Sequence, residues 1–233
     1  MPMPAASMPN AERVGDAFAC RVDVRRGSRR ETHDLFGSAV AFPEGFRYEP
    51  ELISVEEERA LLDEIRRLDF HAVAMHGVVA RRRVIQYGWK YGFDRTGLAP
   101  GPEIPGFLLP ARERAATLAE LASDALSEAL LTEYPPGAPI GWHRDAPGFG
   151  VVVGISLLAP CRFRFRRGPE RGSERVAITL EPRSGYVLSG PARSEWQHSI
   201  PEVDALRYSI TFRTVTRRPV RAGHGGSEDP RSA

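Results

Sequence analysis

The chain has 233 residues, with 32 Lys or Arg against 30 Asp or Glu, so a single domain of ordinary size with a formal net charge of only +2 is expected. This balance excludes a histone-like polycation, and contact with nucleic acid would have to use a local basic patch. Two cysteines exclude a disulfide framework, and the lack of a long apolar run or signal peptide predicts a cytoplasmic protein without membrane contact.

Both ends of the chain differ in composition from its middle. Residues 1–34 and 217–233 are rich in Pro, Ala, Gly and Arg and show no apolar period. We expect a flexible basic N-terminal tail, a flexible C-terminal tail and a single domain over residues 35–216.

Two helices are predicted in the first half of this domain. Ser54, followed three residues later by Glu57, forms a capping-box signal before a helix over residues 54–68 with apolar residues at helical spacing. A second helix is predicted over 110–130, because it begins with Pro110 and repeats Leu and Ala on one face. Between the helices, residues 76–107 predict one or two hairpins followed by a long irregular loop.

After Leu131 the chain becomes a run of short strands separated by Gly, Pro or charged turns. The strands are "VVVGISL", "CRFRFRR", "RVAITLE", "GYVLSG" and "RYSITFRTV", several with a period of two. Such a run without intervening helices predicts a β-rich α+β fold, with a jelly-roll core (a double-stranded β-helix) flanked by two or more outer helices.

The segment "PIGWHRDAPGFGVVVGISLL" places three reactive side chains together. In an extended chain His143 and Asp145 share one face and Arg144 points away. With His198, from "SEWQHSIP", they would complete a two-histidine, one-carboxylate triad, which leaves positions open on Fe(II) for a co-substrate and dioxygen. An HxD pair alone also arises by chance on a surface.

The strand "RYSITFRTV" adds an independent signal. Arg207, Ser209, Thr211 and Arg213 fall on one face, opposite an apolar stripe of aromatic and aliphatic residues. Because burying an unpaired guanidinium is costly, this face predicts either solvent exposure or an anionic ligand such as a small dicarboxylate.

Taken together, "EYPPGAPIGWHRD", "FGVVVGISL", "SEWQHSIP" and "LRYSITFR" resemble the AlkB family of Fe(II)/2-oxoglutarate-dependent dioxygenases. The resemblance covers about residues 34–215. It implies that His143, Asp145 and His198 are the catalytic Fe(II) ligands. It also implies that 2-oxoglutarate is bound by the residues Tyr134, Arg207, Ser209 and Arg213. Thr132 and Ser209 stand where the family often has Asn, and both keep a hydrogen-bonding group.

The implied activity is oxidative demethylation of an alkylated nucleobase in DNA or RNA, with Fe(II) as cofactor and 2-oxoglutarate and dioxygen as co-substrates. In this family the segment between the two helices, here about 71–109, is a lid over the substrate. It offers an arginine triplet and three aromatic residues, from which we predict a substrate-binding set of Trp89, Tyr87, Tyr91 and Arg83. The alternative is a twisted hairpin whose aromatic residues cover the core and whose arginines are solvated.

Pro147 departs from the acidic residue that base-repairing members commonly carry two positions after the metal aspartate. A protein substrate for hydroxylation or demethylation therefore remains an alternative to alkylated nucleic acid. A more remote one is a non-catalytic metal-binding jelly-roll domain. No heptad or large apolar stripe demands a partner chain, which favours a monomer.

Overall fold

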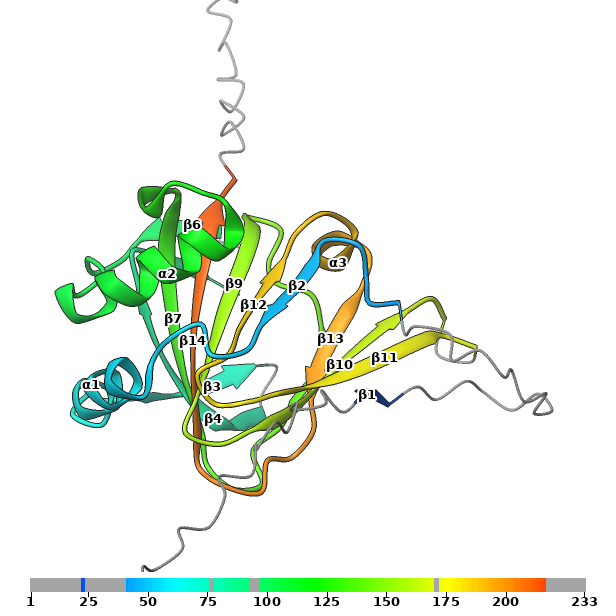
Figure 1. The fold of residues 1–233 in the computed structure, drawn as a ribbon, viewed down its shortest axis with the longest axis horizontal. Coiled ribbons are helices and arrows are strands. Elements are labelled where there is room, and N and C mark those ends of the chain that lie inside the picture. Colours follow the sequence, from blue (N-terminus) through cyan, green and yellow to red (C-terminus); the bar gives the residue numbers. More distant parts are fainter. Residues whose placement is uncertain (1–21, 24–40, 76–77, 93–96, 170–171, 217–233) are drawn as a thin grey trace, which may run out of the picture.

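The computed structural model describes residues 22–23, 41–75, 78–92, 97–169 and 172–216. Two antiparallel sheets pack face to face, and helices α1 (Val55–Ile65) and α2 (Leu109–Ala119) lie against the larger sheet (Figure 1). This is the β-rich α+β jelly roll with outer helices that the sequence predicts.

The larger sheet has seven strands, and β14 lies at its centre. Its neighbours β9 and β7 both pair antiparallel with it, so that Ser209 of β14 lies opposite Ser156 on one side and Thr132 on the other. In spatial order the strands are β2 (Phe46–Glu49), β12 (Gly185–Leu188), β9 (Phe149–Leu157), β14 (Arg207–Val215), β7 (Leu126–Tyr134), β4 (Val78–Tyr87) and β3 (His71–Met75).

The smaller sheet has five strands and ends at β8, which carries His143. Its first strand, β1, falls within residues 1–34, where a tail was predicted, and its residues Val22 and Asp23 pair with β11. In spatial order the strands are β1 (Val22–Asp23), β11 (Glu174–Leu180), β10 (Cys161–Arg167), β13 (Gln197–Ile200) and β8 (Ile140–His143). The predicted domain start at residue 35 and the tail 217–233 lie outside the described residues.

The predicted capping box at the start of α1 is present. The Ser54 hydroxyl accepts a hydrogen bond from the Glu57 amide, and the Glu57 carboxylate accepts one from the Ser54 amide at 2.7 Å. The helix then buries Leu61, Leu62 and Ile65 against the larger sheet. Between the helices the predicted hairpins appear as the β3–β4 pair and a separate hairpin of β5 (Trp89–Gly92) and β6 (Gly97–Pro100).

The second helix is shorter than predicted. A 3₁₀ turn (Gly106–Leu108) leads into α2, which ends at Glu120 in a left-handed conformation, with φ of 56°. A second 3₁₀ turn (Ser123–Ala125) follows, and the predicted helical residues from Leu126 onward form β7 instead. Because β7 lies between β14 and β4, two ladders of backbone hydrogen bonds override the helical propensity of its Leu, Glu and Ala residues.

Two hydrophobic cores result from this arrangement. The first lies between the helices and the outer face of the larger sheet and includes Tyr208, Ile210 and Phe212 of β14. The second lies between the two sheets, with Phe163 and Phe165 of β10 fully buried in it. A short helix, α3 (Gly190–Ser194), interrupts the run of strands, where no helix was predicted. None of the helices in the described ranges is long and apolar enough to cross a membrane.

Candidate active site

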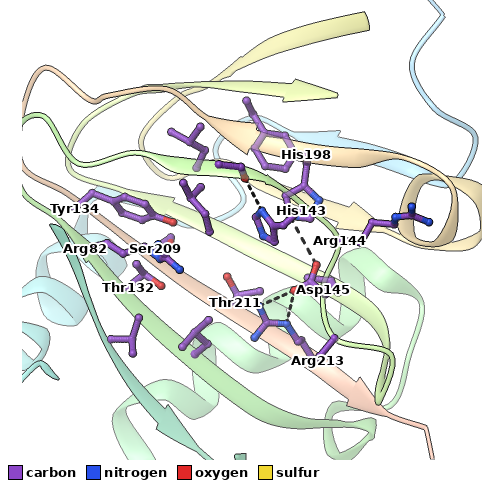
Figure 2. A pocket seen from close by; sticks show the side chains of 18 of the residues that line it. Arg82, Thr132, Tyr134, His143, Arg144, Asp145, His198, Ser209, Thr211 and Arg213 are labelled. Atoms are coloured by element: carbon purple, nitrogen blue, oxygen red, sulfur yellow. Dashed lines mark hydrogen bonds and ion pairs between the residues drawn. The ribbon is translucent and has the colours of Figure 1, made fainter. Parts of the chain in front are cut away.

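A cavity of about 430 Å³ is lined by strands of both sheets (Figure 2). Its side chains come from β4, β7, β9, β12 and β14 of the larger sheet and from β8, β10 and β13 of the smaller one. Val152, Phe163, Tyr186 and Ile200 supply an apolar part of the lining, so the cavity combines a dry surface with a small number of polar groups.

The central strand β14 presents its polar face to this cavity, as the sequence predicts. Arg207, Ser209, Thr211 and Arg213 all line it, whereas the alternate residues of the strand lie in the core beneath the helices. Arg207 is only 1 % exposed and Arg213 only 8 %. Of the two interpretations left open by the sequence, solvent exposure is therefore wrong for the arginines, and an anionic partner is required.

His143, Asp145 and His198 meet at the same cavity (Figure 2). His143 and His198 lie directly opposite each other on the paired strands β8 and β13, and their ring centroids are 4.2 Å apart. Asp145 follows β8, and its Oδ2 lies 3.7 Å from the Nε2 of His198. The side chain of His143 is oriented by a 2.9 Å hydrogen bond from Nδ1 to the carbonyl of Gly141, which leaves Nε2 with its lone pair.

The protonation states of these three side chains suit metal ligation. Burial lowers the pKa of His143 and lowers that of His198 to about 3, so both rings are neutral. Burial alone would raise the pKa of Asp145, but the charge of the nearby Arg213 holds it well below its usual range. All three groups can therefore ligate a cation without first losing a proton.

The donor atoms of these three side chains do not converge on a single point. Among the described residues, no group of three or more His, Cys, Asp or Glu side chains has an arrangement that could hold a metal ion without rearrangement. The buried Oδ2 of Asp145 has no hydrogen-bond partner there, whereas Oδ1 is bound by Arg213. Two neutral imidazoles and one unpartnered carboxylate oxygen are a donor set that fits Fe(II), with a local adjustment of side chains.

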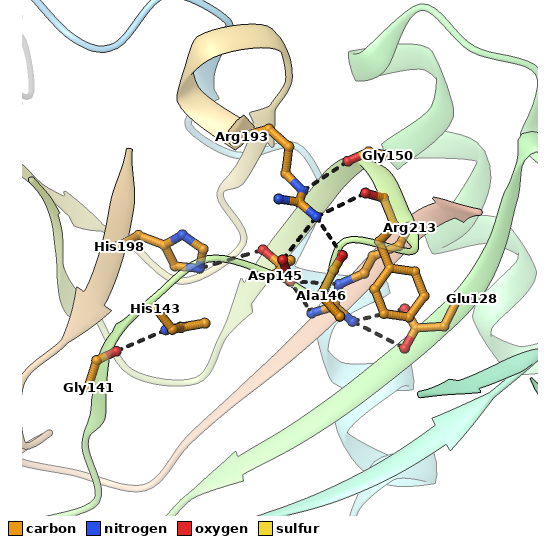
Figure 3. Close-up of polar contacts among 10 residues, drawn as sticks. Glu128, Gly141, His143, Asp145, Ala146, Gly150, Arg193, His198 and Arg213 are labelled. Atoms are coloured by element: carbon orange, nitrogen blue, oxygen red, sulfur yellow. Dashed lines mark hydrogen bonds and ion pairs between the residues drawn. The ribbon is translucent and has the colours of Figure 1, made fainter. Parts of the chain in front are cut away.

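Arg213 is held between two carboxylates (Figure 3). Its Nε donates to Asp145 Oδ1 at 2.8 Å, and its Nη1 donates to both oxygens of Glu128 at 3.1 and 2.9 Å. Glu128 is fully buried in β7. Burial raises the pKa of Glu128 to about 7 against the opposing effect of Arg213, and the negative charge of the nearby Asp145 adds to the rise. Arg213 thereby fixes the position of Asp145.

A second arginine shapes the backbone beside Asp145. Arg193 of α3 donates hydrogen bonds to the carbonyls of Asp145, Ala146, Phe149 and Gly150, at 2.8 to 3.1 Å (Figure 3). These four contacts close the turn between β8 and β9. Neither this residue nor Glu128 was found from the sequence.

Arg207 differs from Arg213 and Arg193, because most of its N–H groups have no hydrogen-bond acceptor among the described residues. Its Nη2 donates to the Ser156 hydroxyl at 3.2 Å, and its guanidinium lies 4.9 Å from the centre of the Tyr134 ring. Within the described part of the chain, its Nε and Nη1 are buried and have no hydrogen-bond partner. A buried cation with two free donors facing a cavity fits the carboxylate of a ligand.

The residues predicted to bind substrate are placed differently. β4 presents Arg82, Val84 and Gln86 to the cavity, so Arg83 and Tyr87 lie on its other face and are not part of the cavity lining. Arg83 instead binds Glu133 at 2.7 Å, and Tyr87 packs against the core beneath the helices. Trp89 is half-buried outside the cavity lining, and the side chain of Tyr91 lies outside the described residues.

Comparisons with known proteins agree with this geometry. The sequence profile of the 2OG-Fe(II) oxygenase superfamily matches residues 46–213. The chain is 28 % identical over 195 residues to an Arabidopsis thaliana protein named "Alkylated DNA repair protein ALKBH8 homolog", covering 72 % of this chain and 54 % of the relative. It is 32 % identical over 143 residues to the human "DNA oxidative demethylase ALKBH2", covering 55 % and 53 %. The chain thus spans about half the length of these two relatives.

A solved structure shares the fold. The structure described as OsALKBH1 superposes with a TM-score of 0.57 at 15 % sequence identity, covering 76 % of this chain and 99 % of that one. This likeness supports the jelly-roll architecture that positions the cavity.

Proposed function

Since the chain belongs to the 2OG-Fe(II) oxygenase superfamily and is AlkB-like within it, we propose that it is a dioxygenase that removes N-alkyl groups from nucleobases of DNA or RNA. The cofactor of this superfamily is Fe(II), and its co-substrates are 2-oxoglutarate and dioxygen. One observation carries the proposal: two neutral histidines and an ionised aspartate line the same cavity as a buried arginine with two unused donors.

In this proposal His143, Asp145 and His198 hold the iron. When it is bound, the chemistry that it supplies is oxidation of an N-methyl C–H bond, coupled to conversion of 2-oxoglutarate and dioxygen to succinate and carbon dioxide. The resulting N-hydroxymethyl group breaks its C–N bond, so that formaldehyde leaves and the nitrogen recovers a proton. Arg213 and Glu128 hold Asp145 in place throughout.

Arg207 anchors the far carboxylate of 2-oxoglutarate. Its Nε and Nη1 are the donors left for that carboxylate, and the hydroxyl groups of Tyr134 and Ser209 lie in the same cavity lining. Arg213 already donates hydrogen bonds to the carboxylates of Asp145 and Glu128, so its contribution is chiefly to position the metal ligand Asp145. This refines the expectation that both arginines bind the co-substrate.

Support for a nucleobase substrate comes from charge at the cavity and from the relatives. Arg82 of β4 and Arg144, which follows β8, both line the cavity, where cations would meet phosphates (Figure 2). The two relatives above are named for DNA repair and DNA demethylation. The cytoplasmic location and the monomeric state predicted from the sequence stay predictions.

The test is formaldehyde release from matched substrates. The protein is supplied with Fe(II), 2-oxoglutarate and dioxygen, and with a single-stranded oligonucleotide containing 1-methyladenine or 3-methylcytosine, its unmethylated counterpart, or a methyl-lysine peptide. We expect formaldehyde with the methylated oligonucleotide alone. Release from the peptide but from neither oligonucleotide would overturn the nucleobase assignment in favour of a protein substrate.

A further inference from the structure

The outer face of the smaller sheet is basic, and nothing in the proposed chemistry accounts for it. Along β10 the residues Phe163 and Phe165 point into the core between the sheets, so Arg162, Arg164 and Arg166 fall on the opposite face. Across the strand pair, Arg166 lies directly opposite Arg175 of β11. Like charges placed directly opposite each other on neighbouring strands lower the stability of a sheet.

Arg164 and Arg166 carry charge that no carboxylate neutralises within the described ranges. The Nε of Arg164 donates to the hydroxyl of Ser199 at 3.1 Å, and the Nε of Arg166 donates to the side-chain oxygen of Gln197 at 2.7 Å. Both acceptors are neutral. Arg167, the next residue, differs sharply because it pairs with Glu174 and Glu195, each at 3.0 Å.

Trp142 orders these two guanidinium groups. The guanidinium carbons of Arg164 and Arg166 lie 5.1 and 4.7 Å from the centre of the Trp142 ring. With Nε bonded and the planar group held against an aromatic ring, each arginine keeps its terminal Nη groups for another partner. Much of the side-chain entropy that a flexible cation loses on binding has therefore been lost already.

The same tryptophan connects this face to the active site. Trp142 directly precedes His143 in β8, and both residues line the cavity. Arg82 and Arg144 lie on opposite sides of the cavity in Figure 2. Cations therefore lie on either side of the cavity, and beyond Trp142 two more follow on the outer face of the smaller sheet.

We propose that the surface formed by Trp142, Arg164 and Arg166, the tryptophan-arginine surface, binds the phosphate backbone of single-stranded nucleic acid beside the nucleotide that enters the cavity. This inference rests on the proposed function and names the form of its substrate. Alternate residues of a strand lie roughly 6.6 Å apart, which is of the same order as successive phosphates along one strand. A single strand also presents its bases without the energetic cost of unpairing a duplex.

A repeating anion fits this surface better than an acidic protein does. Phosphates recur at a fixed interval and lead away from the nucleotide in the cavity, so two further phosphates meet Arg164 and Arg166 without a special sequence. A protein would need acidic residues at one particular spacing from its modified side chain. The planar Nη edges are also suited to phosphate oxygens.

The test is fluorescence anisotropy of the full chain with a labelled, unmethylated oligothymidine about 15 nucleotides long, titrated at several salt concentrations. The Arg164→Gln/Arg166→Gln variant should bind on the order of tenfold more weakly, and the slope of log Kd against log salt should fall by about 1.4, or roughly 0.7 for each lost phosphate contact. Trp142→Leu should weaken binding in the same direction.

The matched control is Arg59→Gln/Arg66→Gln, which removes two exposed charges at α1, on the helix side of the larger sheet. Its affinity and salt slope should stay close to those of the unmodified protein. Thermal melts of each variant establish that it is folded.

The possible results separate this inference from the proposed function. If the unmodified protein binds the oligonucleotide and demethylates its methylated form, but the β10 double variant binds equally well, the tryptophan-arginine surface is overturned and the function stands. If binding depends on Arg164 and Arg166 but no methylated oligonucleotide yields formaldehyde, the surface stands and the function fails. Equal competition by polyglutamate would overturn the assignment of nucleic acid as its partner.

Discussion

Arg213 donates two hydrogen bonds from Nη1 to the carboxylate of Glu128, and this pair is buried beneath the candidate metal site. Because the same guanidinium also holds Asp145, the position of a proposed iron ligand depends on a glutamate of β7, directly opposite Arg213 on the neighbouring strand. Without the Glu128 carboxylate, Arg213 keeps Asp145 as its carboxylate partner but loses the hydrogen bonds that fix its orientation.

Glu128→Gln should therefore lower metal affinity. Because burial favours the neutral form of Glu128 in the folded protein, we expect the neutral amide to change the free energy of unfolding by about 1 kcal/mol or less at pH 7 to 8. We also expect the Kd for Fe(II) to rise on the order of tenfold, because Asp145 loses its orientation. Chemical denaturation and anaerobic metal titration measure the two effects.

Glu133→Gln is the matched control for this variant. Glu133 also lies in β7 and also binds an arginine, but the side chain of Arg83 is 49 % exposed. Its loss should cost about 1 kcal/mol or less and leave metal affinity unchanged. Equal losses of metal affinity in the two variants would contradict the role given to Glu128.

Arg207→Met should separate folding from co-substrate binding. Two of the donors of Arg207 are buried without partners in the described structure, so an apolar replacement should change the stability of the ligand-free protein by about 1 kcal/mol or less, or raise it. The same change should abolish the rise in Tm that 2-oxoglutarate produces in the manganese-loaded protein.

Arg207→Lys keeps the charge but not the planar pair of donors, so it should retain only part of this rise in Tm. A full response to 2-oxoglutarate in Arg207→Met would rule out Arg207 as the anchor.

Gly154→Ala should displace a side chain that lines the cavity. Gly154 of β9 lies directly opposite Tyr186 of β12, and a Cβ at this position would overlap the tyrosine ring. Since Tyr186 is buried and lines the cavity, we expect a stability loss of about 1 to 3 kcal/mol and a higher KM for 2-oxoglutarate. Gly106→Ala, where a Cβ meets nothing within 4 Å, should change neither, as thermal melts and steady-state kinetics can establish.

The parts of the site that the sequence predicts are those carried by strict alternation. The period of two in β14 separates Arg207 and Arg213 from the apolar residues between them, and the structure places both arginines in the cavity. The capping box at Ser54 is equally local, because it depends on residues three apart.

The parts that the sequence does not predict depend on long-range pairing. Leu126 to Leu130 have helical composition, and only their place between β14 and β4 makes them a strand. Nothing in the sequence therefore indicated that Glu128 pairs with Arg213. In β4 the arginine triplet does not show which alternate residues face the cavity, and the structure places Arg82 rather than Arg83 in the cavity lining.

The three proposed iron ligands make a direct prediction for metal binding. His143→Ala, Asp145→Ala and His198→Ala should each abolish stoichiometric Fe(II) binding in anaerobic equilibrium dialysis, because each removes one of only three protein donors. Ser209→Ala, also in the cavity lining, should retain the metal. Full iron binding by any of the three alanine variants would remove that residue from the set.

The most direct test of the central claim is to count succinate and formaldehyde together during turnover of a 3-methylcytosine oligonucleotide. We expect the two products in equal amounts, both dependent on Fe(II) and dioxygen and both lost in Asp145→Ala. Succinate formed without formaldehyde and at a rate indifferent to the oligonucleotide, or formaldehyde that persists in Asp145→Ala, would contradict the account.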